Sequence, residues 1–231
     1  MSKLTKELRT MPAGRRERNK EEKQTRIFDA AERLFDELGF AGVTTQRIAD
    51  EADVAAGTVF RYASTKAELL MMVSNERSRE RIQEGVDRDD PEARATRRLL
   101  ALVTPLARAG RDNDENTLAY QRELLFGEPG ERYREEGLAL FGDLRERMGA
   151  LLADAWRRAH ADATAPEAVA PDPASAARAL SAALHFAIAD AAAHGRPTGD
   201  LLTDLAADFE VIVRGYETDP TTSGQSGQEE K

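Results

Sequence analysis

Apolar side chains recur at helical spacing along most of the chain. In the segment 22–38 they fall at positions i, i+3, i+4, i+7, i+8 and i+11, on one continuous helical face made of Ile27, Ala30, Ala31, Leu34, Phe35 and Leu38. Gly39 follows at the position where a helix commonly ends in a left-handed residue. Alternating runs of Val, Ile and Thr, which would indicate strands, are absent. The pattern predicts an all-α fold.

Helix start signals divide the first third of the chain. Thr44 is a good N-cap for a second helix, and a short third helix is predicted at roughly 56–62. Thr65 and Glu68 have the spacing of a capping box and open a longer fourth helix. A helix as short as the third is marginal by itself in water. The short helix must therefore be stabilised by the fold around it or by a binding partner.

The remaining sequence carries further apolar stripes at helical spacing up to residue 213. Asp90-Pro91 and Asp172-Pro173 each place an N-cap residue before a proline, a pattern that predicts a helix start. With these elements we expect about nine helices. The boundaries predicted are a disordered basic arm at 1–20, a first helical domain at 21–80, a second at 81–217 and a disordered tail at 218–231.

Composition narrows the function classes. The 231 residues include no Cys and three His without ligand spacing, which leaves no basis for a disulfide, a thiolate metal site or a cysteine nucleophile. We predict no metal, no cofactor and no catalytic residues, because no known catalytic or nucleotide-binding motif occurs. The first thirty residues lack an apolar stretch and no segment is apolar for long enough to span a bilayer, so we expect a cytoplasmic protein without membrane contact.

Charge is distributed unevenly. The net charge is −9, but residues 1–26 carry nine Lys or Arg against four Glu. Exposed charges more than about 10 Å apart act largely independently at 0.1 M salt. A basic N-terminal region can therefore dock on phosphates although the rest of the chain is acidic.

Residues 44–63 have the length and the break of a helix-turn-helix, whose second helix lies in a DNA major groove. Small residues at the start of the second helix would let the backbone approach DNA, and Arg61 and Tyr62 can reach a base edge or a phosphate. The residues expected to contribute from the pattern are Thr45, Gln46, Arg47, Gly57, Thr58, Arg61, Tyr62 and Lys66. On spacing alone, a small helical bundle with a short connecting helix is equally compatible.

A resemblance adds to this pattern. Residues 25–70, "TRIFDAAERLFDELGFAGVTTQRIADEADVAAGTVFRYASTKAELL", resemble the N-terminal DNA-binding domain of the TetR family of bacterial transcriptional regulators in one gapless register. The resemblance implies a homodimer, a palindromic operator in double-stranded DNA, and a ligand pocket for a small-molecule effector in the C-terminal helices. The family's DNA contacts, carried to this sequence, are Thr45, Gln46, Ala56, Gly57, Phe60, Arg61, Tyr62 and Lys66.

Four positions depart from the family pattern. Asp53 replaces the usual glycine of the turn and is one of the few residue types that tolerate a left-handed conformation. Ala55 replaces a serine and removes a helix cap, while Phe60 replaces a tyrosine and cannot donate to a phosphate. Ala63 replaces an aromatic residue that packs under the recognition helix. We expect the fold to survive and the DNA affinity to change.

The C-terminal apolar stripes predict the other two sites. For the dimer interface, the last two helices offer Leu180, Leu184, Ala187, Ile188, Leu202, Leu205, Phe209 and Ile212, although periodicity alone is equally compatible with intramolecular core. For the ligand pocket, the candidates are Met72, Tyr120, Phe126, Phe141, Trp156, His185 and Phe186, residue types that more often belong to an ordinary core. The function predicted is a ligand-responsive homodimeric repressor. The alternative is a helical protein-interaction module that has lost DNA binding.

Overall fold

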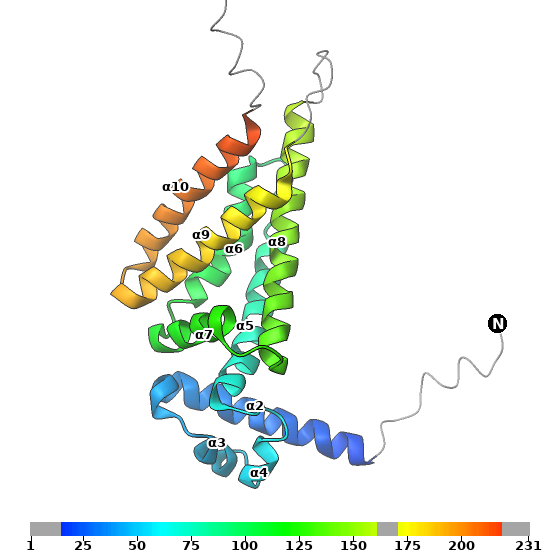
Figure 1. The fold of residues 1–231 in the computed structure, drawn as a ribbon, viewed down its shortest axis with the longest axis vertical. Coiled ribbons are helices and arrows are strands. Elements are labelled where there is room, and N and C mark those ends of the chain that lie inside the picture. The colour runs from blue at the N-terminus through cyan, green and yellow to red at the C-terminus, as the bar shows by residue number, and fades with distance from the viewer. Residues whose placement is uncertain (1–14, 161–170, 219–231) are drawn as a thin grey trace, which may run out of the picture.

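The structure, a computed structural model, describes residues 15–160 and 171–218. These residues form nine helices and no strand, which confirms the all-α prediction (Figure 1). The helices are α2 (Arg15–Gly42), α3 (Thr45–Glu51), α4 (Ala56–Val59), α5 (Lys66–Asp87), α6 (Ala95–Ala109), α7 (Asp114–Phe126), α8 (Arg132–Ala159), α9 (Pro173–His194) and α10 (Thr198–Glu217). Within the part described, no helix is both long and apolar enough to cross a membrane.

The segments predicted to be disordered lie mostly outside the described residues. The one exception needs correction, because α2 begins at Arg15 and residues 15–20 are helical rather than a disordered arm. This stretch consists mostly of Arg, Glu and Lys, which favour a helix once the amphipathic segment 22–38 has nucleated one. The arm at 1–14 and the tail beyond Thr218 are not among the described residues.

The head of the molecule consists of α2, α3, α4 and the first turns of α5, and it lies across the lower end of the body (Figure 1). Its core contains the buried side chains of Ile27, Phe35, Ile48 and Val59. Gly39 has φ 67° and breaks the helical path within α2, as predicted. This positive φ is what favours glycine here, because the nearest group that a Cβ would meet is the flexible side chain of Glu115, which can move.

The body contains α6 to α10 and most of α5, which runs from the head upward into the bundle (Figure 1). The largest helix contacts are those of α5 with α6 and α8, and of α9 with α8 and α10. The α5–α6 crossing is tight, because a Cβ at Gly85 would lie 2.0 Å from the carbonyl oxygen of Leu102. The head and body are therefore joined by one continuous helix whose upper half is locked into the bundle.

Most of the predicted dimer residues are buried within the single chain. Leu180, Leu184, Ile188, Leu205 and Phe209 are buried within the single chain, with at most 3% of each exposed. These faces of α9 and α10 belong to the intramolecular core, since both helices pack on the rest of the bundle and on each other. Ala187, Leu202 and Ile212 are partly buried against the same core. The large apolar side chains that α9 and α10 do expose are Phe186 (71%) and Val211 (72%).

Candidate nucleic-acid interface and ligand cavity

The helix-turn-helix occupies the end of the head that faces away from the body (Figure 1). Thr44 caps α3, its hydroxyl oxygen accepting the N–H of Arg47 at 3.1 Å. Ala55 stands at the N-cap of α4 and supplies no side-chain bond, as its loss of a hydroxyl predicts. The short α4 is held instead by the buried Val59.

The structure places the predicted DNA-contact residues on this head. Gln46, Arg47, Gly57, Phe60 and Arg61 are exposed, and Thr45, Ala56, Thr58, Tyr62 and Lys66 are partly buried. Asp53 in the turn has φ 50°, so the left-handed conformation expected of the family's glycine is kept with a non-glycine residue. Phe60 is 52% exposed and Ala63 is buried, so the two departures near the recognition helix are compatible with the fold.

Tyr62 and Lys66 already have partners inside the head. The hydroxyl of Tyr62 donates to the carbonyl oxygen of Lys20 at 3.1 Å, which ties the start of α2 to the turn after α4. The ammonium group of Lys66 donates to the carbonyl oxygen of Phe40 at 2.8 Å. The same group lies 4.2 Å from the centre of the Phe40 ring. Lys66 therefore stabilises the bend after Gly39, and its contact with DNA stays a prediction.

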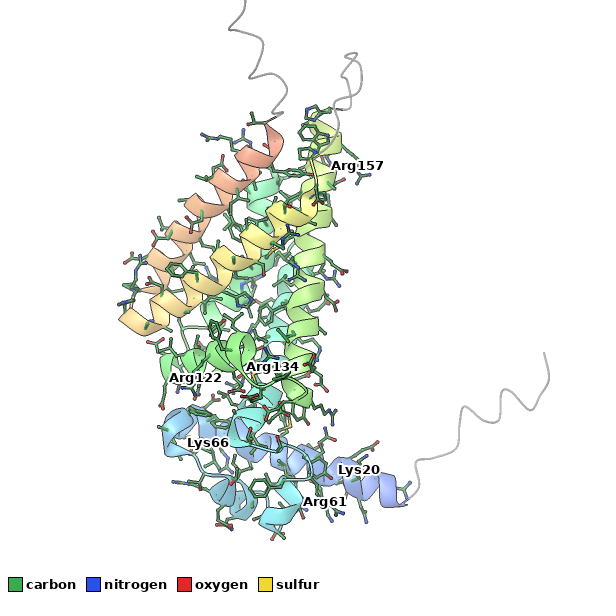
Figure 2. All side chains as sticks on the ribbon, in the orientation of Figure 1. Lys20, Arg61, Lys66, Arg122, Arg134 and Arg157 are labelled. Atoms are coloured by element: carbon green, nitrogen blue, oxygen red, sulfur yellow. The ribbon has the colours of Figure 1, made fainter. Side chains whose placement is uncertain are left out.

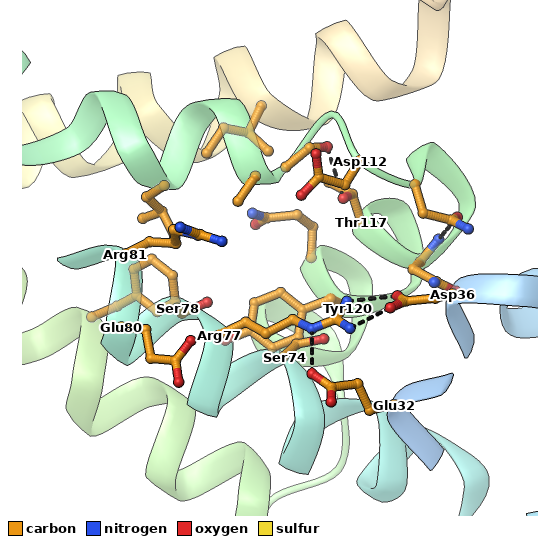
Figure 3. A pocket seen from close by; sticks show the side chains of 18 residues that line it. Glu32, Asp36, Ser74, Arg77, Ser78, Glu80, Arg81, Asp112, Thr117 and Tyr120 are labelled. Carbon is orange, nitrogen blue, oxygen red and sulfur yellow. Dashed lines mark hydrogen bonds and ion pairs between the residues drawn. The ribbon is translucent and has the colours of Figure 1, made fainter. Parts of the chain in front are cut away.

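A cavity of about 520 Å³ opens where the head meets the body (Figure 3). Its walls come from α2, α5, α8, α9 and the α6–α7 region. Of the predicted pocket residues, only Tyr120 and Phe141 line it. Four of the others lie away from this cavity: Met72 is buried core, Trp156 stacks on His160 at 3.8 Å between ring centroids, and Phe126 and Phe186 are 82% and 71% exposed.

His185 lies directly behind this wall. Its ring is 4.7 Å from that of Phe141, and Nδ1 is 2.9 Å from the amide oxygen of Gln121, which lines the cavity. Burial lowers the pKa of His185 to about 4, so the imidazole is neutral at pH 7. Burial also raises the pKa of Tyr120, whose hydroxyl donates to Asn75 Oδ1 at 2.9 Å. The inner wall is therefore a set of neutral hydrogen-bonding groups beside an aromatic ring.

The outer wall contains residues that sequence reasoning missed, and these residues hold the head to the body. Arg77 of α5 donates to both carboxylate oxygens of Asp36 at 2.7 and 2.5 Å, and to Glu32 at 3.0 Å (Figure 3). These bonds raise the pKa of Arg77 further above its usual range. Asn116 of α7 donates to the carbonyl oxygen of Phe35 at 2.8 Å.

The side-chain amide of Asn116 also has an acceptor in the cavity wall that is unpaired within the described chain. Asn116 Oδ1 is buried and has no hydrogen-bond partner among the described residues. No local pattern in the sequence announces either contact, because Arg77 and Asn116 lie 41 and 81 residues from their partners Asp36 and Phe35.

Comparison with known proteins decides the nature of the head. Residues 27–72 match the family profile described as "Bacterial regulatory proteins, tetR family". The N-terminal domain is a TetR-family DNA-binding domain. The HTH-type transcriptional repressor KstR of Mycobacterium tuberculosis is 36% identical over 109 residues, which are 46% of this chain and 49% of KstR. The chain thus spans about half the length of the curated relatives it matches.

Solved structures of transcriptional regulators match the fold over 83% of this chain. FadR of Bacillus subtilis, solved in complex with stearoyl-CoA, has a TM-score of 0.59 at 18% identity, covering 83% of this chain and 98% of that one. Thermus thermophilus FadR, solved with lauroyl-CoA, has a TM-score of 0.58 at 24% identity, covering 83% and 93%. At these identities the likeness establishes that the body shares the fold of such regulators.

Proposed function

We propose that this protein is a ligand-responsive, dimeric transcriptional repressor that acts in the cytoplasm by binding a palindromic operator in double-stranded DNA. The observation that carries the proposal is the match of residues 27–72 to the tetR-family profile, on a body whose cavity reaches the head. In a dimer, the two recognition helices would read half-sites about 34–36 Å apart, or a multiple of that.

The second copy would pack against the exposed apolar side chains of α9 and α10. Phe186 and Val211 meet this need better than the predicted leucines, because they remain exposed in the single chain. Large apolar side chains left exposed on helices of a single chain are typical of an interface between subunits.

The cavity supports control by a small molecule. Arg77 and Asn116 line it and also hold Asp36 and Phe35 of α2. An effector that prefers other positions of these two side chains would shift the head relative to the body and change the spacing of the recognition helices. Such a shift needs a difference in the effector's affinity for the two states.

The wall chemistry favours a compact polar effector. Hydroxyl and amide groups line the inner part, including the unpartnered Asn116 Oδ1, and four carboxylates against two guanidinium groups line the outer part. We therefore expect an uncharged or cationic molecule with hydrogen-bond donors. The stearoyl-CoA and lauroyl-CoA bound in the FadR structures are the ligands against which such a molecule is to be compared.

The test is selection of bound duplexes from a random pool at moderate salt, with the Arg61→Ala/Lys66→Ala double variant as control. Enrichment of a palindrome by the native protein alone supports a dimeric sequence reader. An absence of enrichment contradicts the proposal and favours a helical protein-interaction module. Candidate effectors, with stearoyl-CoA and lauroyl-CoA beside them, are then ranked by their release of the selected duplex.

A further inference from the structure

A second groove lies beside the recognition helix and is strongly cationic. Its described lining consists of Lys20, Lys23, Arg61 and Arg132, together with Thr58, Tyr62 and two amides, and contains no carboxylate. Lys20 and Lys23 come from the first turns of α2, and Thr58 belongs to α4. Arg132, however, is the first residue of α8 and belongs to the body. The groove thus combines cations from the head and from the body.

Three of these cations, Lys23, Arg61 and Arg132, are available to a ligand. Lys23 and Arg61 are exposed and form no ion pair with any residue that the structure describes. The side chain of Arg132 is 63% exposed, and its one carboxylate partner in the described chain is Glu136, at 2.9 Å on its own helix. An exposed pair of this kind contributes about 0.5 kcal/mol. A phosphate group therefore competes easily with Glu136 for Arg132.

The position of the groove is fixed by contacts from both sides. The Tyr62 hydroxyl bond to Lys20 holds the start of α2 against the turn after α4. Glu68, at the start of α5, accepts the backbone N–H groups of Tyr133 and Arg134, directly after Arg132. Figure 2 shows Lys20 and Arg61 at the same end of the molecule, while Arg157 lies at the opposite end of α8.

We propose that this cationic groove binds the phosphate backbone of the operator beside the recognition helix, so that Arg132 is a DNA contact supplied by the body. The proposal rests on the proposed function, because it assigns a further part of the same DNA surface. Lys23 and Arg61 of the head and Arg132 of the body together match a polyanion, and Thr58 and Arg61 extend the groove onto the predicted reading surface. A phosphate contact from α8 would also make DNA affinity sensitive directly to the position of the body.

The experiment measures binding of the full chain to the selected duplex as a function of salt. Each lost phosphate contact lowers the slope of log K against log[salt] by about 0.9, equivalent to roughly a fivefold loss of affinity at 0.15 M salt. We expect this change in Arg132→Gln and in Lys23→Gln, equally on specific and random duplexes. The matched control is Arg157→Gln, which removes the same charge from the far end of α8 and should leave the slope unchanged.

A companion variant guards against a folding defect in Arg132→Gln. Glu136→Gln keeps Arg132 and removes its competitor, and we expect duplex affinity to rise roughly twofold, as loss of a helical ion pair of about 0.5 kcal/mol predicts. Slopes in Arg132→Gln and Arg157→Gln that both equal the native slope would overturn the inference, as would a fall in affinity in Glu136→Gln. If Arg61→Gln still abolishes binding in that case, the proposed function stands without the groove. A native protein that binds no duplex overturns both.

Discussion

The carboxylate of Glu68 accepts the backbone N–H of Tyr133 through both of its oxygens, at 3.1 and 3.2 Å, although the two residues are 65 positions apart. Its Oε1 also accepts the N–H of Arg134 at 3.2 Å. Glu68 is only 2% exposed, and burial raises its pKa against the opposing effect of these bonds. One buried carboxylate from the start of α5 therefore caps the first turn of α8.

Replacing Glu68 tests this cap. Glu68→Ala leaves two backbone donors without their acceptor, and we expect the free energy of unfolding to fall by roughly 2–3 kcal/mol, measured by urea denaturation. Thr65→Ala is the local control, since it removes only the side-chain cap of α5 at 3.0 Å and should cost about 1 kcal/mol. Equal losses in the two variants would mean that the bonds to α8 contribute nothing.

The ion pair between Arg77 and Asp36 should couple the head to the body. In a double-mutant cycle of Arg77→Gln and Asp36→Asn, we expect a coupling free energy of about 1 kcal/mol in thermal or urea unfolding. The same variants should also alter the response of duplex binding to an effector, because both side chains line the cavity. A coupling free energy of zero would show that the bidentate ion pair of Arg77 and Asp36 is offset by solvation and does not hold the head to the body.

The turn of the helix-turn-helix offers a stabilising substitution. Asp53 has φ 50°, a conformation that is disfavoured for residues with a Cβ and free of that cost in glycine. Asp53→Gly should raise the melting temperature, with a gain of about 0.5–1 kcal/mol, and its exposed partner Arg26 loses little. Asp53→Ala should instead destabilise the head, and a melting temperature equal to that of the glycine variant would refute the conformational explanation.

Arg61 and Lys66 should separate in their effects. Arg61→Ala should weaken operator binding and relax base preference while the melting temperature stays unchanged, because the side chain is exposed and unpaired among the described residues. Lys66→Ala should weaken all duplexes alike and also lower stability by roughly 1 kcal/mol, since it loses its bond to Phe40. Binding selections and melting curves on the two variants check this division, which identical profiles would disprove.

His185 should make stability depend on pH. Its pKa falls from 6.5 to about 4 on folding, so the unfolded chain binds the proton more readily between these values. Stability from this group is complete above pH 6.5 and is lost as the pH falls toward 4, by up to about 3 kcal/mol. His185→Gln should flatten the unfolding free energy over this range relative to the native protein. A parallel pH profile in the variant would show that other groups titrate there.

The Asp-Pro pair is a local pattern that can form either a helix start or a turn, and the sequence predicted a helix start at both pairs. The Asp-Pro pair at 172 starts α9 as predicted, with Asp172 accepting the N–H of Ala174 at 3.0 Å. The same pair at 90 makes only a turn, closed by Ala93 N–H to the Asp90 carbonyl at 2.9 Å. Asp89, just before it, is bound by Arg98 of α6 at 2.7 and 2.8 Å, and α6 starts only at Ala95. The tertiary ion pair decides between the two conformations.

The sequence by itself determined most of the helices and the bend at Gly39, because caps and helical periodicity act over a few neighbouring positions. The nature of the head and the left-handed turn at Asp53 followed from the resemblance of residues 25–70 to a known family. The tertiary structure alone decided which stripes face inward and which residues meet. Leu184 and Phe209 are buried in the core of the single chain, since periodicity marks an apolar face without specifying what packs on it. The Glu68 cap, the Arg77 contact and the place of Arg132 beside Arg61 join residues far apart in sequence, and only packing brings such residues together.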